Sequence, residues 1–180
     1  MQVNGTIEVQ QDIEGEAEAL TIGVHAALRM IQATGAVTPT AIALAREGAG
    51  WRGVWQMNVS QALMRGQEGM QELGYIVAKL VSPTGCDLSA IGVAPEHFKA
   101  DGVLVVTEGK ATDNGPHVTE PTEWRSVSVE LRTHGGACAL LYRVTEQASE
   151  HGTEVTLTFV ARSSTLESPL NARPETMVLH

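Results

Sequence analysis

Cysteine, aromatic residues and charge are all scarce in this 180-residue chain, and each scarcity excludes a class of protein. The two cysteines, Cys86 and Cys138, lie far apart, and neither belongs to a CxxC or a Cys/His ligand spacing. The sequence therefore supports neither a disulfide framework nor a zinc site. Aromatic residues make up only 4% of the chain, so the core must be built mainly from Val, Leu, Ile, Ala and Met. We predict no cofactor and no metal.

Basic residues are also few, with 12 Lys and Arg against 21 Asp and Glu, so the formal net charge is −9. A protein that grips a phosphate backbone needs clustered cations to displace counterions. Arg125, Arg132 and Arg143 have acidic neighbours in sequence and form no such cluster. The composition disfavours a nucleic-acid partner and favours protein partners, a basic one included.

Long apolar runs are missing as well. No window approaches the roughly 18 uninterrupted apolar residues that a membrane-spanning helix requires. The first residues, Met1–Glu8, lack the basic region and apolar run of a secretory signal. We expect a soluble protein, either cytoplasmic or assembled in a particle.

Three segments near the end of the chain have the alternating pattern of strands with one buried face. Trp124–Arg132 alternates Val127, Val129 and Leu131 with Ser126, Ser128 and Glu130. Thr153–Ala161 places Val155, Leu157, Phe159 and Ala161 on its apolar face. Ala137–Thr145 lies between them, bounded by the turn-forming clusters His134–Gly136 and Ser149–Gly152. The pattern predicts an antiparallel meander.

The earlier part of the chain has helical spacing. Glu16–Ala33 repeats apolar residues every three or four positions and is followed by Gly35, which predicts a helix. A shorter helix is predicted from Thr38 and Pro39 through Ala45. A third begins near Ser60 and continues to Leu73, while Tyr75–Val81 fits either helix or strand.

The remaining segments complete a single domain over residues 1–180. Residues 1–10 form a strand or arm, and Gly102–Thr107 is an interior strand. Residues 108–123 contain two prolines and few apolar residues, so we expect a long loop there, and residues 163–180 form an extended tail. The fold class is α+β, with N-terminal helices packed on one face of a mainly antiparallel sheet of about four to five strands.

No catalytic motif accompanies the histidines. His25 lies beside the apolar stripe of the first helix, and His97 is adjacent to Glu96, which in regular structure points their side chains apart. His117 lies in the expected loop. Cys138 alternates with core residues, so a buried thiol is favoured over a nucleophile paired with His134. We find no HExxH, GxSxG or phosphate-binding loop.

The outward face of the meander has the mixed character of a subunit interface, with small apolar residues and hydroxyls rimmed by arginine. The interface candidates on this face are Arg132, Leu141, Arg143 and Val160. Trp51 and Trp55 are further candidates, because an exposed tryptophan there would indicate a partner surface.

Three functional hypotheses follow. The first is a non-catalytic structural or interaction subunit that forms a homo-oligomer or a larger particle, a virion-type particle included, through its sheet face, N-terminal arm and long loop. The second is a small-molecule enzyme or binding protein with a pocket between sheet and helices, for which the polar candidates are His25, His97, Asp101 and His117. The third is an acidic, immunity-type inhibitor of a basic partner.

Overall fold

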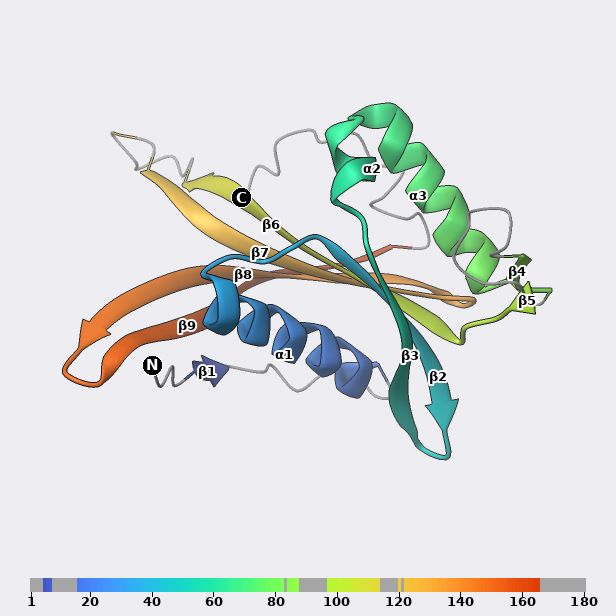
Figure 1. The fold of residues 1–180 in the computed structure, drawn as a ribbon, viewed down its shortest axis with the longest axis horizontal. Coiled ribbons are helices and arrows are strands. Elements are labelled where there is room, and N and C mark those ends of the chain that lie inside the picture. Colours follow the sequence, from blue (N-terminus) through green and yellow to red (C-terminus); the bar gives the residue numbers. More distant parts are fainter. Residues whose placement is uncertain are drawn as a thin grey trace.

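A curled sheet carries the fold, and the described residues contribute seven strands to it (Figure 1). The computed structural model describes residues 5–7, 16–82, 84–87, 97–113, 120 and 122–165. Among these residues the strands lie in the order β1-β9-β8-β7-β6-β2-β3, and each pair of neighbours is antiparallel except β1 and β9, which are parallel. The strands are β1 (Gly5–Ile7), β2 (Thr40–Glu47), β3 (Gly50–Asn58), β6 (Gly102–Asp113), β7 (Thr122–Thr133), β8 (Gly136–Ser149) and β9 (Gly152–Thr165).

Three helices and a small ribbon complete the described structure. The helices are α1 (Ala17–Thr34), α2 (Ser60–Met64) and α3 (Gln67–Leu80), and the ribbon pairs β4 (Cys86–Asp87) with β5 (His97–Phe98). The α+β class is confirmed, with more strands than the four to five expected. The helices cover both faces of the sheet: α1 lies on one face, and α2 and α3 lie on the other (Figure 1).

Helix α1 packs its apolar stripe on the inner face of the sheet. Leu20, Val24 and Ile31 are buried in one cluster with Leu104, Val106 and residues of the meander. The helix ends where Gly35 adopts a left-handed conformation with φ of 80° and donates its N–H to the Ile31 carbonyl. Glycine favours this conformation, which explains why the helix stops there. The predicted first helix is confirmed.

The meander is also confirmed as β7, β8 and β9, with Val127, Val129 and Leu131 in the core. The prediction for Ala161 is wrong. The pairing skips Val160, so Phe159 lies opposite Tyr142 but Ala161 lies opposite Leu141. Residues directly opposite each other in an antiparallel pair share a face, so this bulge moves Ala161 to the outer face.

The predicted short helix from Thr38 and Pro39 through Ala45 is wrong, because this segment forms strand β2. Ala41 and Ala43 face α3, whereas Ile42 and Leu44 face α1, and all four are buried. A strand covered on both sides needs no alternation of apolar and polar residues. Its continuous apolar run therefore cannot be distinguished from a short helix by periodicity.

A second apolar cluster lies between α3 and the outer face. Leu73, Val77 and Leu80 pack on Ala43 and Val103. Tyr75–Val81, which fitted either helix or strand, is helical through Leu80. The start of α3 lies close to α2 at Gly69, where a Cβ would lie 1.8 Å from the carbonyl oxygen of Ala62.

The prediction of a loop over the whole of residues 108–123 is wrong, because both ends of this segment belong to strands. Glu108–Asp113 continue β6 and pair in register with β7, which begins at Thr122. Polar residues suit these strand ends because they lie beyond the helices that bury the rest of the sheet. Residues 114–119, 121 and the tail over 166–180 lie outside the described part of the chain.

Candidate functional site: a groove beside the edge strand

Strand β3 is an edge of the sheet. It pairs with β2 on one side, and no strand in the described part of the chain pairs with its other side. The register skips Val54, which forms a bulge between Gly53 and Trp55. Val54 is 37% exposed and is one of three exposed large apolar residues in the described structure.

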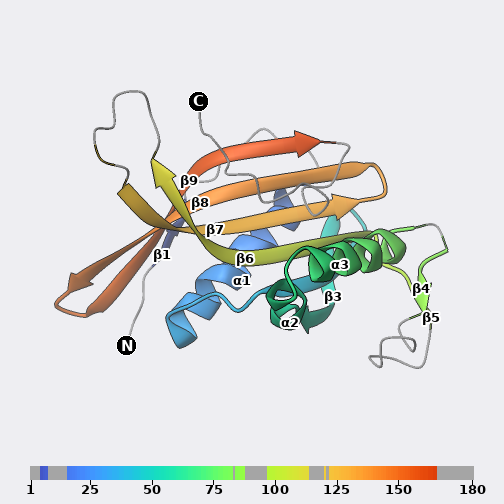
Figure 2. The same cartoon turned by 90° about the horizontal axis from the view of Figure 1, so that it is seen from above.

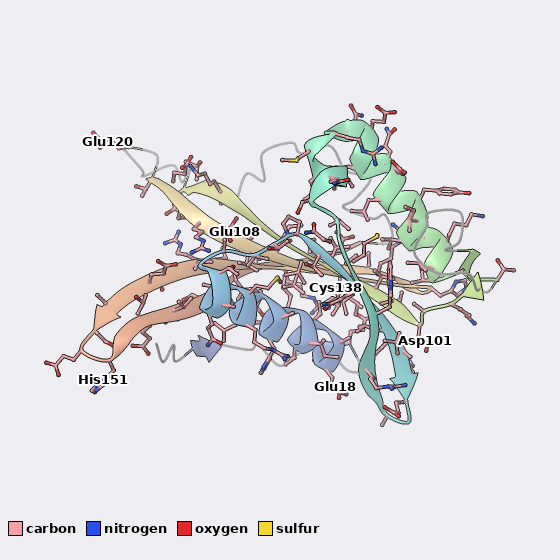
Figure 3. All side chains as sticks on the ribbon, viewed as in Figure 1. Glu18, Asp101, Glu108, Glu120, Cys138 and His151 are labelled. Carbon is pink, nitrogen blue, oxygen red and sulfur yellow. The ribbon has the colours of Figure 1, made fainter. Side chains whose placement is uncertain are left out.

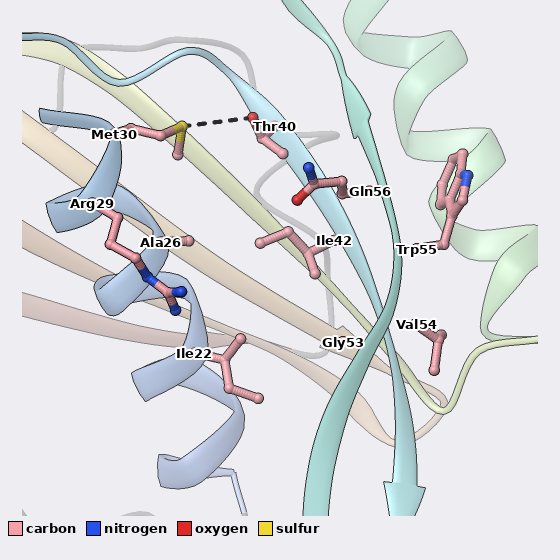
Figure 4. A pocket seen from close by; sticks show the side chains of 10 residues that line it. All are labelled: Ile22, Ala26, Arg29, Met30, Thr40, Ile42, Gly53, Val54, Trp55 and Gln56. Atoms are coloured by element: carbon pink, nitrogen blue, oxygen red, sulfur yellow. Dashed lines mark hydrogen bonds between the residues drawn. The ribbon is translucent and has the colours of Figure 1, made fainter. Parts of the chain in front are cut away.

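The bulge separates the two tryptophans of β3. A spacing of four residues places two side chains on the same face of a regular strand. Here Trp51 is buried in the α1 cluster, with the Arg46 guanidinium 4.3 Å from its ring centroid, whereas Trp55 packs against the α3 cluster. Figure 4 shows Trp55 pointing away from α1. Both tryptophans were interface candidates, and each packs into one of the two apolar clusters of the chain itself.

A groove of about 550 Å³ runs between α1 and the strand pair β2–β3 (Figure 4). Its lining comes from all three elements: Ile22, Ala26, Arg29 and Met30 from the helix, Thr40 and Ile42 from β2, and Gly53, Val54, Trp55 and Gln56 from β3. Gly53 contributes no side chain to the groove, and the bulge lets Trp55 point away from α1, which leaves the space beside the helix open.

The walls of the groove are largely apolar. Ile22, Ala26 and Met30 are partly buried and pack on the α1 cluster, and Ile42 is buried beneath them. Thr40 donates a hydrogen bond of 2.7 Å to the Thr38 carbonyl and lies 3.9 Å from the Met30 sulfur. No aspartate or glutamate lines the groove. The charged group in its lining is the guanidinium of Arg29.

A second organised region lies where the sheet forks (Figure 2). β7 and β8 pair only from Ser126 and Arg143 onward, and beyond Arg143 the described part of β8 pairs with β9 alone. Arg125 lies on the α1 side of this fork and contacts Glu108 of β6, Glu146 of β8 and the Gly35 carbonyl. One guanidinium thus joins both arms of the fork to the end of α1.

The charges of this network are mutually stabilised. Burial by itself would raise the pKa of Glu108, but hydrogen bonds from Arg125 and from the Val37 N–H outweigh it, so the pKa lies below its ordinary value. The hydrogen bond to Glu108 is the main reason that the pKa of Arg125 is raised. Because every partner belongs to the fold, the network is structural.

The outer face of the fork holds a second arginine. Arg143 donates hydrogen bonds of 2.9 Å to Asp113 and stacks 4.5 Å from the ring centroid of Trp124. Trp124 in turn donates its indole N–H to Asp113 over 3.0 Å. Two nitrogens on this face, Nε of Arg143 and Nη1 of Arg132, are buried and have no hydrogen-bond partner among the described residues.

The other interface candidates lie on the same outer face without forming one open surface. Leu141 and Arg132 are half-buried, and Val160 occupies the β9 bulge. Several polar and small residues predicted to face outward are buried within the chain: Ser126, Glu130 and Ala139. The face is therefore less accessible than its pattern indicated.

The polar pocket candidates do not converge on the groove. His25 is exposed on α1 and does not line it, and Asp101 accepts the Arg46 backbone N–H over 2.7 Å. The backbone of His97 lies in β5, but its side chain, like the whole of His117, is outside the described structure. The described residues contain no group of three or more His, Cys, Asp or Glu placed to hold a metal ion.

Cys138 is buried in the α1 cluster, in agreement with the prediction of a core thiol (Figure 3). Sequence reasoning did not identify Arg29, Val54 or Gln56 as groove residues. The one available signal was the spacing of Ile22 and Ala26, which lie beside the buried stripe of α1.

Comparison with protein-family models, with curated proteins and with solved structures gives no match to this chain. None of the described helices is both long enough and apolar enough to span a membrane.

Proposed function

We propose that this protein is a non-catalytic interaction subunit that forms a homo-oligomer through the outer edge of β3. One observation carries the proposal: a nine-residue edge strand has no neighbour among the described strands on its outer side. Such an edge presents a row of backbone N–H and C=O groups that can pair with another chain.

The side chains of β3 offer little protection against such pairing. Natural edges are often protected by lysine, proline or inward-pointing charges, whereas β3 contains a single charged residue, Arg52, and no proline. The bulge at Val54 twists the edge, which restricts pairing to a strand of matching twist. A second copy of β3 related by a two-fold axis has that twist, and two-fold dimers are the commonest homo-oligomers.

The outer face of β7 and β8 supports assembly less well. Ser126, Glu130 and Ala139 on that face are already buried within one chain. A partner that used this face would first have to displace what buries them, so the β3 edge requires less rearrangement.

Light scattering after size exclusion tests the proposal. We expect a mass of twice the 19.1 kDa chain for the wild type. Val54→Lys should return the mass to that of one chain, because a lysine on the edge strand must lose its hydration when two edges meet.

Met64→Lys is the matched control, because Met64 is 87% exposed on α2, away from β3. This variant should remain dimeric. A wild type that stays a monomer at high concentration would overturn the proposal, as would equal effects of the two lysines.

A further inference from the structure

We infer that the groove between α1 and β3 binds an elongated apolar molecule that ends in a single carboxylate. The inference goes beyond the proposed oligomer and does not depend on it, because the groove is complete within one chain.

The apolar part of the ligand is indicated by the walls of the groove. Ile22, Ala26 and Met30 are only partly buried although they pack on the core, and Val54 is exposed on the opposite wall. A bound alkyl chain would cover the three helix side chains and remove apolar surface from water, which is favourable. The volume of about 550 Å³ lies within the roughly 300–1,000 Å³ typical of small-molecule sites.

The carboxylate is indicated by Arg29. Its side chain is exposed, and it forms no ion pair or hydrogen bond with any described residue. In Figure 4 it extends from α1 alongside Ala26 and Ile22, at the rim of the apolar walls. A planar guanidinium can hold a carboxylate through two parallel hydrogen bonds.

The other polar groups agree with an anionic ligand. The Gln56 amide lies on the opposite wall and can donate N–H groups, and no carboxylate lines the groove to attract a cation. A single cation beside mainly apolar walls matches one anionic end on an otherwise apolar molecule.

Calorimetric titration with decanoate, below the concentration at which it forms micelles, tests the inference. The wild type should bind decanoate more tightly than decan-1-ol, which has the same chain without the charge. Arg29→Glu should weaken decanoate binding about tenfold or more, because the charge-assisted hydrogen bonds are replaced by repulsion. Arg29→Lys should retain part of the affinity, and the affinity for decan-1-ol should change little in either variant.

Ala26→Trp should abolish binding of both compounds by filling the groove. The matched control is Ala33→Trp, which places the same side chain at an exposed position of α1. Circular dichroism shows whether each variant is folded. Equal affinity for decanoate and decan-1-ol, or binding of decanoate that survives both Arg29→Glu and Ala26→Trp in folded protein, would overturn the inference. Neither binding result would change the mass that light scattering measures, so this test is independent of the test of the proposed oligomer.

Discussion

Arg125 makes polar contacts with three parts of the chain that are distant in sequence. Its Nη2 donates to the Gly35 carbonyl over 2.6 Å and to Glu108 over 3.0 Å, and its Nη1 reaches Glu146. The side chains of Arg125 and Glu108 are only 26% and 22% exposed. Solvent therefore screens this pair less than a typical surface ion pair.

Glu108→Gln should lower the free energy of unfolding by about 1–3 kcal/mol at pH 7, as expected for hydrogen bonds to a charged group. The pKa of Glu108 in the folded protein lies below the ordinary value of 4.5. Its ionised form therefore stabilises the fold fully above that value, and the contribution is lost as the pH falls through the folded pKa. Urea unfolding at pH 7, 5 and 3 should show the free energies of unfolding of the wild type and the variant converging as the pH falls.

Glu150→Gln, at an exposed turn, is the control and should change the free energy of unfolding little. Parallel pH profiles of wild type and Glu108→Gln would contradict this interpretation.

At the scale of elements, the contact between α1 and the sheet depends on a glycine. A Cβ at Gly23 would lie 2.5 Å from Cγ1 of Val129 and 3.5 Å from Cδ1 of Leu104. Valine is stiff at χ1 and cannot turn away at little cost. Helix and sheet therefore approach as closely as they do only because position 23 has no side chain.

Gly23→Ala tests this contact. Overpacking costs about 1–3 kcal/mol, whereas the better helix propensity of alanine restores about 1 kcal/mol. We expect a net loss of up to about 2 kcal/mol in the free energy of unfolding, measured by urea denaturation. His25→Ala changes an exposed residue of the same helix and should stay within about 0.5 kcal/mol of the wild type. A Gly23→Ala variant more stable than the wild type would show that the contact is looser than described.

At the scale of the molecule, the fork divides a well-covered sheet from a projecting hairpin (Figure 2). Val127–Leu131 pair with strands on both sides and lie mostly in the core. Within the described part of the chain, Glu146–Ser149 pair with β9 alone, and they are exposed. Backbone hydrogen bonds with few buried contacts around them open at low free-energy cost.

Hydrogen exchange should therefore be faster at Glu146–Ser149 than at Val127–Leu131. Arg125→Gln should speed exchange further in the hairpin, because it releases Glu146 from the fork. Arg162→Gln, at an exposed position of β9, serves as the control. Equal protection of the two segments would mean that the hairpin is held by more than its pairing with β9.

Much of the fold could be predicted from local patterns, and much of the candidate site could not. The alternation in β7 and β9 and the spacing in α1 are properties of consecutive residues, so they identify strands and helix directly. The groove joins Ile22 and Met30 to Gln56 across a turn, a strand and a bulge. Neither segment has a periodicity that indicates this proximity. The bulge that turns Trp55 to the other face of the strand cannot be predicted from the alternation of apolar and polar residues.

The sequence by itself determined the α+β class, the helix that ends at Gly35, the meander and the inward direction of Cys138. Each depends on interactions between residues close in the chain or on a simple division into buried and exposed faces. Only the tertiary structure decided that the run from Ala41 to Leu44 is a strand, because apolar cover on both faces comes from α1 and α3, which are distant in sequence. It also decided that β3 lies at an edge of the sheet and that Arg29 lies beside an apolar groove, because strand order and helix placement follow from packing of the whole chain.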